Sequence, residues 1–398
     1  MTDRIDVGPR RTRRRSDPPA GIIAVATVDT YDSINRPLLR LGSSSGRASV
    51  GRWCGRSPVD RPDGREGRSE GDADLPAASS LGVPCVMKEL FPLFGVVAIP
   101  QTPFTESGAV DFDSLERSLD DRIAAGVGGI LGPVVASEVG QLSEAERRDY
   151  VRLVLERVPP DVPVVVGCSA PSMRDIQAMA EFASELGAAG ILVQVPFEIM
   201  RDEPAVLRFF RQVCEVQIPM LMIQDLEWGA PGLPIGSIVR LFEELPAFRC
   251  IKIETVPAGP KYSAVLEATG GRLNVSGGWA MPQLIEALDR GVHAIMPGGL
   301  HWPIAQIVRM HAAGNRDGAR ALFDRLLPTL VWQNQHIDIS NQFLKLLAVR
   351  QGIYTTATLR NPGTPFDRYH SRIATELLEE TMTLHEELGW RPCLKAAK

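Results

Sequence analysis

Lysine is scarce in this chain, which carries most of its positive charge on arginine. Only six of its 398 residues are lysine, and the other 37 basic residues are arginine. Arginine stays protonated in proteins, whereas a buried lysine can lose its proton and attack a carbonyl as the free amine. Each lysine is therefore a candidate for amine chemistry. The six stand at positions 88, 252, 261, 345, 395 and 398.

Other absences exclude whole classes of protein. No apolar run approaches the roughly 20 residues of a membrane-spanning helix. The six cysteines are scattered, without metal-ligand spacing, so neither a disulfide framework nor a zinc site is predicted. The net charge of -5 lacks the basic excess of proteins that bind nucleic acid through phosphates. We expect a cytoplasmic protein without nucleic-acid or membrane partners.

Residues 1–87 differ in composition from the rest of the chain. Arginines cluster within residues 10–15, and short groups of Ser, Gly, Pro and Asp follow. Such a composition buries too little apolar surface to offset the entropy of ordering. We expect this segment to be disordered, or to precede a true start at Met87. A basic tail that contacts nucleic acid is the alternative, and the many Asp residues oppose a transit peptide.

From residue 94 onward, short apolar runs alternate with amphipathic stretches that have helix-start signals, such as the capping box Ser143 to Glu146. The runs are continuously apolar, which is typical of parallel strands covered on both faces. The eight predicted strands are Gly95–Pro100, Gly129–Val135, Pro163–Cys168, Gly190–Val195, Pro219–Gln224, Arg249–Glu254, Leu273–Ser276 and His293–Met296.

Eight strand–helix units predict an α/β protein, a (β/α)8 TIM barrel, over residues 88–305. A doubly wound open sheet is the alternative, but no Gly-x-Gly-x-x-Gly follows the first strand. Residues 306–398 read as a C-terminal helical layer, with helices expected at Arg316–Leu330, Asn341–Gln351 and Asp367–Leu388.

The active site of such a barrel lies at the C-terminal ends of its strands. Lys252 is notable there because it interrupts the apolar strand Cys250–Ile253. Its side chain is expected to point into the barrel, where burial favours the neutral amine. The alternative is a structural lysine paired with Glu254, which shares its face of the strand.

The order of several short motifs resembles the dihydrodipicolinate synthase / N-acetylneuraminate lyase family of class I Schiff-base lyases. No single motif is specific, but together they span residues 94–379 in the right order, and Lys252 matches the family's imine-forming lysine. The motifs are Val97–Phe104, Glu138 with Leu142–Arg147, Val162–Gly167, Gly187–Gly190 with Pro196-Phe197, Ile218-Pro219 and Ile251-Lys252.

Two departures from the family pattern bear on the reaction. The family's second strand usually ends Gly-Thr-Thr-Gly-Glu, which holds the substrate carboxylate, whereas this chain has Val134-Val135-Ala136-Ser137-Glu138. Ile223 stands at the position of a tyrosine that relays protons, and no other tyrosine is expected near a strand end. Synthase and neuraminate lyase activities are therefore not expected.

The segments Ser137-Glu138, Ile223–Asp225 and Lys252–Thr255, and more weakly Asn334-Gln335, are similar to the L-2-keto-3-deoxyarabonate dehydratase branch. The resemblance implies a Schiff-base lyase that dehydrates a 2-keto-3-deoxy sugar acid. Three alternatives remain: a retro-aldolase or synthase that releases or uses pyruvate, a non-catalytic sugar-acid-binding barrel, and a phosphate-binding barrel at Gly298-Gly299.

The predicted site follows from these motifs. No metal or cofactor is predicted, and the partner is a 2-oxo acid, with a homotetramer implied by the family. Lys261 is expected to be solvated, and His301 to have no catalytic role. The predicted catalytic residues are Lys252, Glu138, Gln224 and Asp225, and the predicted substrate-binding residues are Ala136, Ser137, Glu254, Gly277, Gly278 and Trp279.

Overall fold

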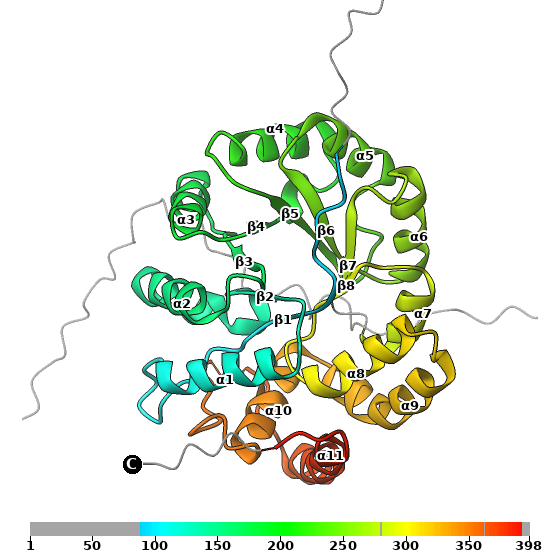
Figure 1. Ribbon diagram of the computed structural model, residues 1–398. Helices are drawn as coiled ribbons and strands as arrows, with labels where there is room; N and C mark the ends of the chain where they lie inside the picture. Colours follow the sequence, from blue (N-terminus) through cyan, green and yellow to red (C-terminus); the bar gives the residue numbers. More distant parts are fainter. Residues whose placement is uncertain (1–87, 279–280, 362, 392–398) are drawn as a thin grey trace, which may run out of the picture. The chain divides into compact units, whose positions relative to one another are not determined.

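The computed structural model describes residues 88–278, 281–361 and 363–391. Eight parallel strands close into a barrel in chain order, with β8 paired to β1, so the predicted TIM barrel is confirmed (Figure 1). The strands are β1 (Gly95–Ala98), β2 (Gly129–Leu131), β3 (Val164–Gly167), β4 (Gly190–Gln194), β5 (Leu221–Glu227), β6 (Phe248–Thr255), β7 (Asn274–Gly277) and β8 (Ala294–Ile295).

In the part of the chain that the structure describes, eight α-helices surround the barrel and three more form the C-terminal layer (Figure 1). The barrel helices are α1 (Phe112–Ala124), α2 (Glu144–Arg157), α3 (Met173–Glu185), α4 (Glu203–Val213), α5 (Ile235–Glu244), α6 (Gly259–Ala268), α7 (Leu284–Asp289) and α8 (His301–Ala312). The layer contains α9 (Arg316–Gln333), α10 (Ile337–Arg350) and α11 (Arg368–Glu387).

Local signals in the sequence set the helix starts. The side chain of Ser143 accepts a hydrogen bond from the Glu146 amide, and the Glu146 side chain accepts one from the Ser143 amide, so the predicted capping box is present. The side chains of Asp111 and Ser172 cap α1 and α3 by accepting hydrogen bonds from the amides of Ser114 and Asp175. Removing such a cap typically costs about 1 kcal/mol.

Apolar side chains pack on both sides of the barrel wall, which explains why the strand sequences do not alternate. Met220, which directly precedes β5, and Met222 on β5 belong to the cluster inside the barrel. Leu221 and Ile223 belong to the larger cluster between the barrel and its helices. The even-numbered residues of β5 therefore face inward, and this phase decides which β5 side chains can reach a site at the end of the strand.

The C-terminal layer begins later than the sequence indicated. The expected boundary after residue 305 falls inside α8, the eighth barrel helix, which continues to Ala312. Beyond α10, the hydroxyl of Tyr354 donates to the Gln101 carbonyl 2.9 Å away and so fastens the layer to the segment that follows β1.

Within the described residues, no helix has the length and apolar composition that a membrane span requires. The expectation for residues 1–87 lies outside the described residues.

Candidate active site

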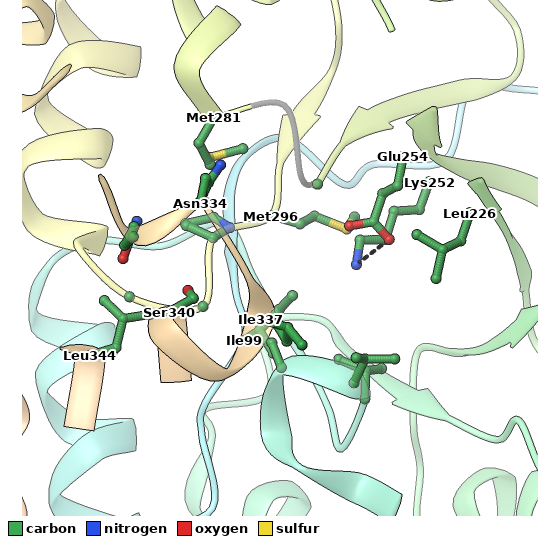
Figure 2. A pocket seen from close by; sticks show the side chains of 18 of the residues that line it. Ile99, Leu226, Lys252, Glu254, Met281, Met296, Asn334, Ile337, Ser340 and Leu344 are labelled. Carbon is green, nitrogen blue, oxygen red and sulfur yellow. Dashed lines mark ion pairs between the residues drawn. The ribbon is translucent and has the colours of Figure 1, made fainter. Parts of the chain in front are cut away.

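A cavity opens at the C-terminal ends of the strands, and α9 and α10 form its far wall (Figure 2). Lys252 and Glu254 are the charged side chains among the described residues that line it. The other lining residues are Ile99, Val134, Val135, Ala136, Gln224, Leu226, Trp228, Gly278, Met281, Met296, Pro297, Gly298, Gly299, Ile304, Leu330, Gln333, Asn334, Ile337, Ser340 and Leu344.

Lys252, Glu254 and Gln224 form one connected polar group in this cavity. The Lys252 ammonium lies 3.1 Å from Glu254 Oε2, and the two side chains are 4% and 8% exposed (Figure 2). Gln224, which pairs in register with Lys252 across β5 and β6, donates from Nε2 to the same oxygen at 2.5 Å. A single carboxylate oxygen therefore holds both the amine and the amide. Paired as it is with Glu254, Lys252 nevertheless borders the cavity.

Gly278, just after β7, leaves room for this group. A β-carbon at this position would overlap the Glu254 carboxylate and lie 2.6 Å from Lys252 Cε. The close approach of the backbone thus depends on glycine.

We predict that Gly278→Ala displaces Glu254 and Lys252, because real β-carbons do not tolerate such contacts. Trapping of a 2-oxo acid on Lys252 by borohydride, measured by intact mass, should fall by about tenfold or more, as for a lost positioning contact. Gly140→Ala is the matched control, since a β-carbon there meets no atom within 4 Å. Equal trapping in both variants would contradict the packing argument.

The side chain of Ile223, at the β5 position that the motif spacing matched to the family's tyrosine, does not point into the cavity. Ile223 is fully buried in the outer cluster, between the barrel and its helices. Gln224, one residue further on, is the inward residue level with Lys252. Because the inward residue is an amide, a phenol is absent from this part of the wall.

The expectation that no other tyrosine approaches a strand end was wrong. Tyr150 donates to the Pro100 carbonyl at 2.9 Å, and the Tyr262 hydroxyl would lie 2.6 Å from a β-carbon at Gly277. Both start on helices, but their long side chains reach the barrel rim. Neither of them lines the cavity.

Glu138 lies behind the cavity wall rather than in the cavity. It pairs with the fully buried ammonium of Lys345 from α10, which also donates to the Thr358 carbonyl at 2.9 Å. Burial raises the pKa of Glu138, and the opposing attraction of Lys345 only partly offsets this effect. The geometry gives Glu138 a role in attaching the β2 loop to the C-terminal layer.

Lys345→Met should leave the Glu138 carboxylate buried and unpaired, at a cost of about 3–5 kcal/mol in the free energy of unfolding. Equilibrium urea unfolding measures this cost. Arg157→Met is the control, because the exposed Arg157–Asp120 pair is worth about 1 kcal/mol or less. The double variant Glu138→Leu/Lys345→Met should be more stable than Lys345→Met alone. A loss no larger than that of the control would contradict this role of the Glu138–Lys345 pair.

Asp225 is likewise held away from the cavity. It accepts a hydrogen bond from the Leu233 amide at 2.9 Å and pairs with Lys261 from α6. Lys261 is 8% exposed, so the expectation that it is solvated was wrong. Its ammonium also donates to the Pro231 carbonyl. This pair fixes the loop between β5 and α5, which carries Trp228 to the cavity wall.

The remaining predicted residues divide between the cavity and its surroundings. Ala136 and Gly278 line the cavity. Ser137 does not, because its hydroxyl is fully buried and donates to the Pro100 carbonyl at 2.8 Å. Gly277 faces Tyr262 instead. Trp279 lies outside the described residues.

His301 lies at the start of α8, away from the cavity, with Nε2 2.7 Å from Asp121 Oδ2. Burial lowers its pKa, although Asp121 opposes this shift. Among the described residues, no group of three His, Cys, Asp or Glu side chains is arranged to hold a metal ion.

Several cavity residues were not identified from the sequence. Trp228, Gln333 and Ser340 carry no motif, and they meet at the cavity because the loop after β5 and the helices α9 and α10 fold over the barrel. The inward phase of β5 could have indicated Leu226 as well as Gln224.

Comparisons with known proteins identify the family of this chain. The family model described as the Dihydrodipicolinate synthetase family matches residues 92–381. An L-2-keto-3-deoxyarabonate dehydratase from Azospirillum brasilense is 26% identical over 291 residues, which is 71% of this chain and 92% of the relative. A 4-hydroxy-tetrahydrodipicolinate synthase from Sodalis glossinidius (strain morsitans) is 27% identical over 290 residues, which is 72% of this chain and 98% of the relative.

Among solved structures, a dihydrodipicolinate synthase from Rhodopseudomonas palustris matches with a TM-score of 0.68 at 23% identity. The match covers 73% of this chain and 99% of that one, and it shows the shared fold. The family match, which covers most of the described residues, supports an enzyme of the Schiff-base class I lyase type. The chain belongs to the dihydrodipicolinate synthetase family.

Proposed function

We propose that this protein is a Schiff-base lyase that removes water from a 2-keto-3-deoxy sugar acid. The observation that carries the proposal is the contact of 3.1 Å between Lys252 and Glu254 inside the cavity at the barrel mouth. An amine bordering a cavity, with a carboxylate positioned to exchange protons with it, is the minimum apparatus for imine chemistry.

Lys252 is the proposed nucleophile. After Glu254 takes a proton from its ammonium, the free amine attacks C2 of the 2-oxo acid, and the former keto oxygen leaves as water. The protonated imine withdraws electrons from C3, so a proton at C3 becomes removable. The resulting enamine expels the C4 hydroxyl, which takes up a proton as it leaves as a second water. One water then hydrolyses the conjugated imine, which restores the C2 keto group and frees the Lys252 amine, so the net change is the loss of one water.

Glu254 is the proposed acid and base for these transfers, in place of Glu138 and Asp225. Those two carboxylates pair with Lys345 and Lys261 outside the cavity. Glu254 borders the cavity directly and is held by Gln224. Gln224 has no proton to transfer at neutral pH, so its proposed role is to position the carboxylate.

The substrate carboxylate requires a cradle without threonine hydroxyls. Ala136 and Gly298 face each other across the cavity wall, with a β-carbon at Gly298 lying 3.6 Å from Cβ of Ala136. Arg122, buried behind this wall, donates to the Gly298 carbonyl at 3.2 Å. We assign the carboxylate to the backbone of these two segments, since glycine lets an anion approach the peptide closely.

The same enamine could instead break the C3–C4 bond and release pyruvate, so an aldolase or synthase is the second candidate. Its support is the names of two relatives: the synthase from Sodalis glossinidius given above, and a trans-O-hydroxybenzylidenepyruvate hydratase-aldolase from Pseudomonas putida, which is 32% identical over 122 residues. Dehydration is favoured because, among the described residues, no tyrosine lines the cavity to relay protons to a second substrate.

Product analysis tests the proposal. Incubation with a 2-keto-3-deoxypentonate or -hexonate should give a product lighter by one water, without free pyruvate, by mass spectrometry. Pyruvate as the main product would assign an aldolase, and a cyclised product from pyruvate and aspartate semialdehyde would assign a synthase. Calorimetric binding with neither turnover nor a borohydride-trapped adduct would assign a non-catalytic sugar-acid-binding barrel. The homotetramer implied by the family is part of the proposal, and analytical ultracentrifugation tests it.

A further inference from the structure

The cavity has a second polar wall, opposite the amine. Figure 2 shows Lys252 and Glu254 on one side, Asn334 and Ser340 on the other, and Met296 between them. Gln333 also lines the cavity, beside Asn334 at the end of α9. These three polar side chains come from the junction of α9 and α10, far in sequence from the strand ends.

Gln333 is the strongest indication that this wall binds a ligand. The residue is 5% exposed, and its side-chain oxygen accepts no hydrogen bond from the described residues. A buried amide oxygen without a donor is costly, so such groups normally have a protein, water or ligand partner. Since Gln333 borders the cavity, a hydroxyl group of a bound molecule can supply the missing donor.

Packing on the other side of the helix junction holds this wall in place. The Trp332 ring lies 5.6 Å from the ring of Phe343 and 5.6 Å from that of Phe366, edge-on in both cases. His336 caps α10 by accepting from the Asp338 amide at 3.2 Å. A ligand contact at Gln333 would therefore be made by a preorganised group rather than by a mobile one.

The neighbours of this wall define the chemistry of its ligand. Leu330, Ile337 and Leu344 surround the three polar side chains, and no described residue that lines this end of the cavity is charged. A second carboxylate or a phosphate would lose its hydration there without gaining a cation. A neutral chain with hydroxyl groups fits, because amide and hydroxyl side chains can both donate to it and accept from it.

We propose that Gln333, Asn334 and Ser340 form a subsite for the hydroxyl groups at the far end of the substrate. This inference rests on the proposed function, since it takes the 2-oxo end of the substrate to be bound at Lys252. The C-terminal layer then selects 2-oxo acids with an uncharged, hydroxylated tail over short or acidic ones.

Three ligands distinguish binding of the substrate tail from binding of its 2-oxo end. Pyruvate has no tail, 2-oxopentanoate has an apolar tail, and 2-keto-3-deoxypentonate has a hydroxylated tail of the same length. Gln333→Leu and Ser340→Ala should each weaken trapping of the hydroxylated acid on Lys252 about tenfold, the effect of one lost hydrogen bond that leaves a polar group unpaired. Trapping of pyruvate and 2-oxopentanoate should change less than about twofold.

Gln335→Leu is the matched control, because it makes the same replacement two residues away on the exposed side of the junction. It should leave all three ligands unaffected. Equal losses for pyruvate and the hydroxylated acid would reduce Gln333 and Ser340 to a structural role, and unchanged trapping of the hydroxylated acid would overturn the subsite.

Calorimetry with Lys252→Ala separates the subsite from the proposed function, because this variant binds ligands without forming an imine. Against this background, the hydroxylated acid should bind more tightly than 2-oxopentanoate, and Gln333→Leu should remove the difference. Equal affinities would overturn the subsite. Absence of any trapped adduct in the wild-type protein would overturn the proposed function, and the calorimetry would still decide the subsite.

Discussion

Lys252→Arg should abolish turnover of a 2-keto-3-deoxy acid while leaving the barrel folded. A guanidinium keeps the positive charge beside Glu254, but it cannot lose a proton and form an imine. The rate of water loss should fall by about 10³-fold or more, because the residue acts as the nucleophile. Borohydride reduction with the substrate should add no mass to the variant, whereas peptide mapping of the wild-type protein should locate the adduct on Lys252.

Lys88→Arg is the control for this experiment. Lys88 is half-buried and donates to the Leu245 carbonyl at 2.8 Å, outside the cavity, so its replacement should leave both the adduct and the rate intact. A rate for Lys252→Arg above a few per cent of wild type would refute the imine mechanism. A similar loss in Lys88→Arg would show that lysine replacement acts through folding instead.

The strands could be predicted from the sequence because their signal is local. Each apolar run is covered on both faces, and all eight predicted strands occur. Their ends were less predictable. β5 continues to Glu227, three residues beyond the predicted end, because Asp225, Leu226 and Glu227 pair with β6. The polar residues in this extension have partners on other elements, such as Lys261 and Arg201, which no local pattern indicates.

The scarcity of lysine identified buried amines without showing which one borders the cavity. Of the lysines in the described residues, Lys252, Lys261 and Lys345 are all buried, and each pairs with a carboxylate. Lys252 differs in that it lines the cavity. Its strand position and the family resemblance indicated that difference, whereas composition alone could not.

Partners that are far apart in sequence could not be predicted. Glu138 and Lys345 are separated by more than 200 residues, and only the docking of α10 against the β2 loop brings them together. Gln333 and Ser340 reach the cavity through the same docking. The sequence therefore could not distinguish the candidate acids and bases. The structure favours Glu254, which lines the cavity, over Glu138 and Asp225.

Glu254→Gln should separate imine formation from elimination. Glutamine has nearly the shape of glutamate and can still accept a hydrogen bond from Gln224, but it cannot take a proton from C3 or deliver one to the leaving hydroxyl. Water loss should therefore slow by about 10²–10⁴-fold, the usual contribution of a general acid or base. With a longer incubation, borohydride should still trap an adduct on Lys252, because the amine still lines the cavity.

Two further variants decide whether Glu254 transfers protons or only positions Lys252. Glu254→Asp keeps a carboxylate at a shorter reach, so it should recover part of the activity that Glu254→Gln loses, and Glu244→Gln should act like wild type because Glu244 pairs with surface arginines. If Glu254 only positioned the amine, the glutamine variant would lose adduct and turnover together. If it transfers protons, the adduct persists while turnover falls.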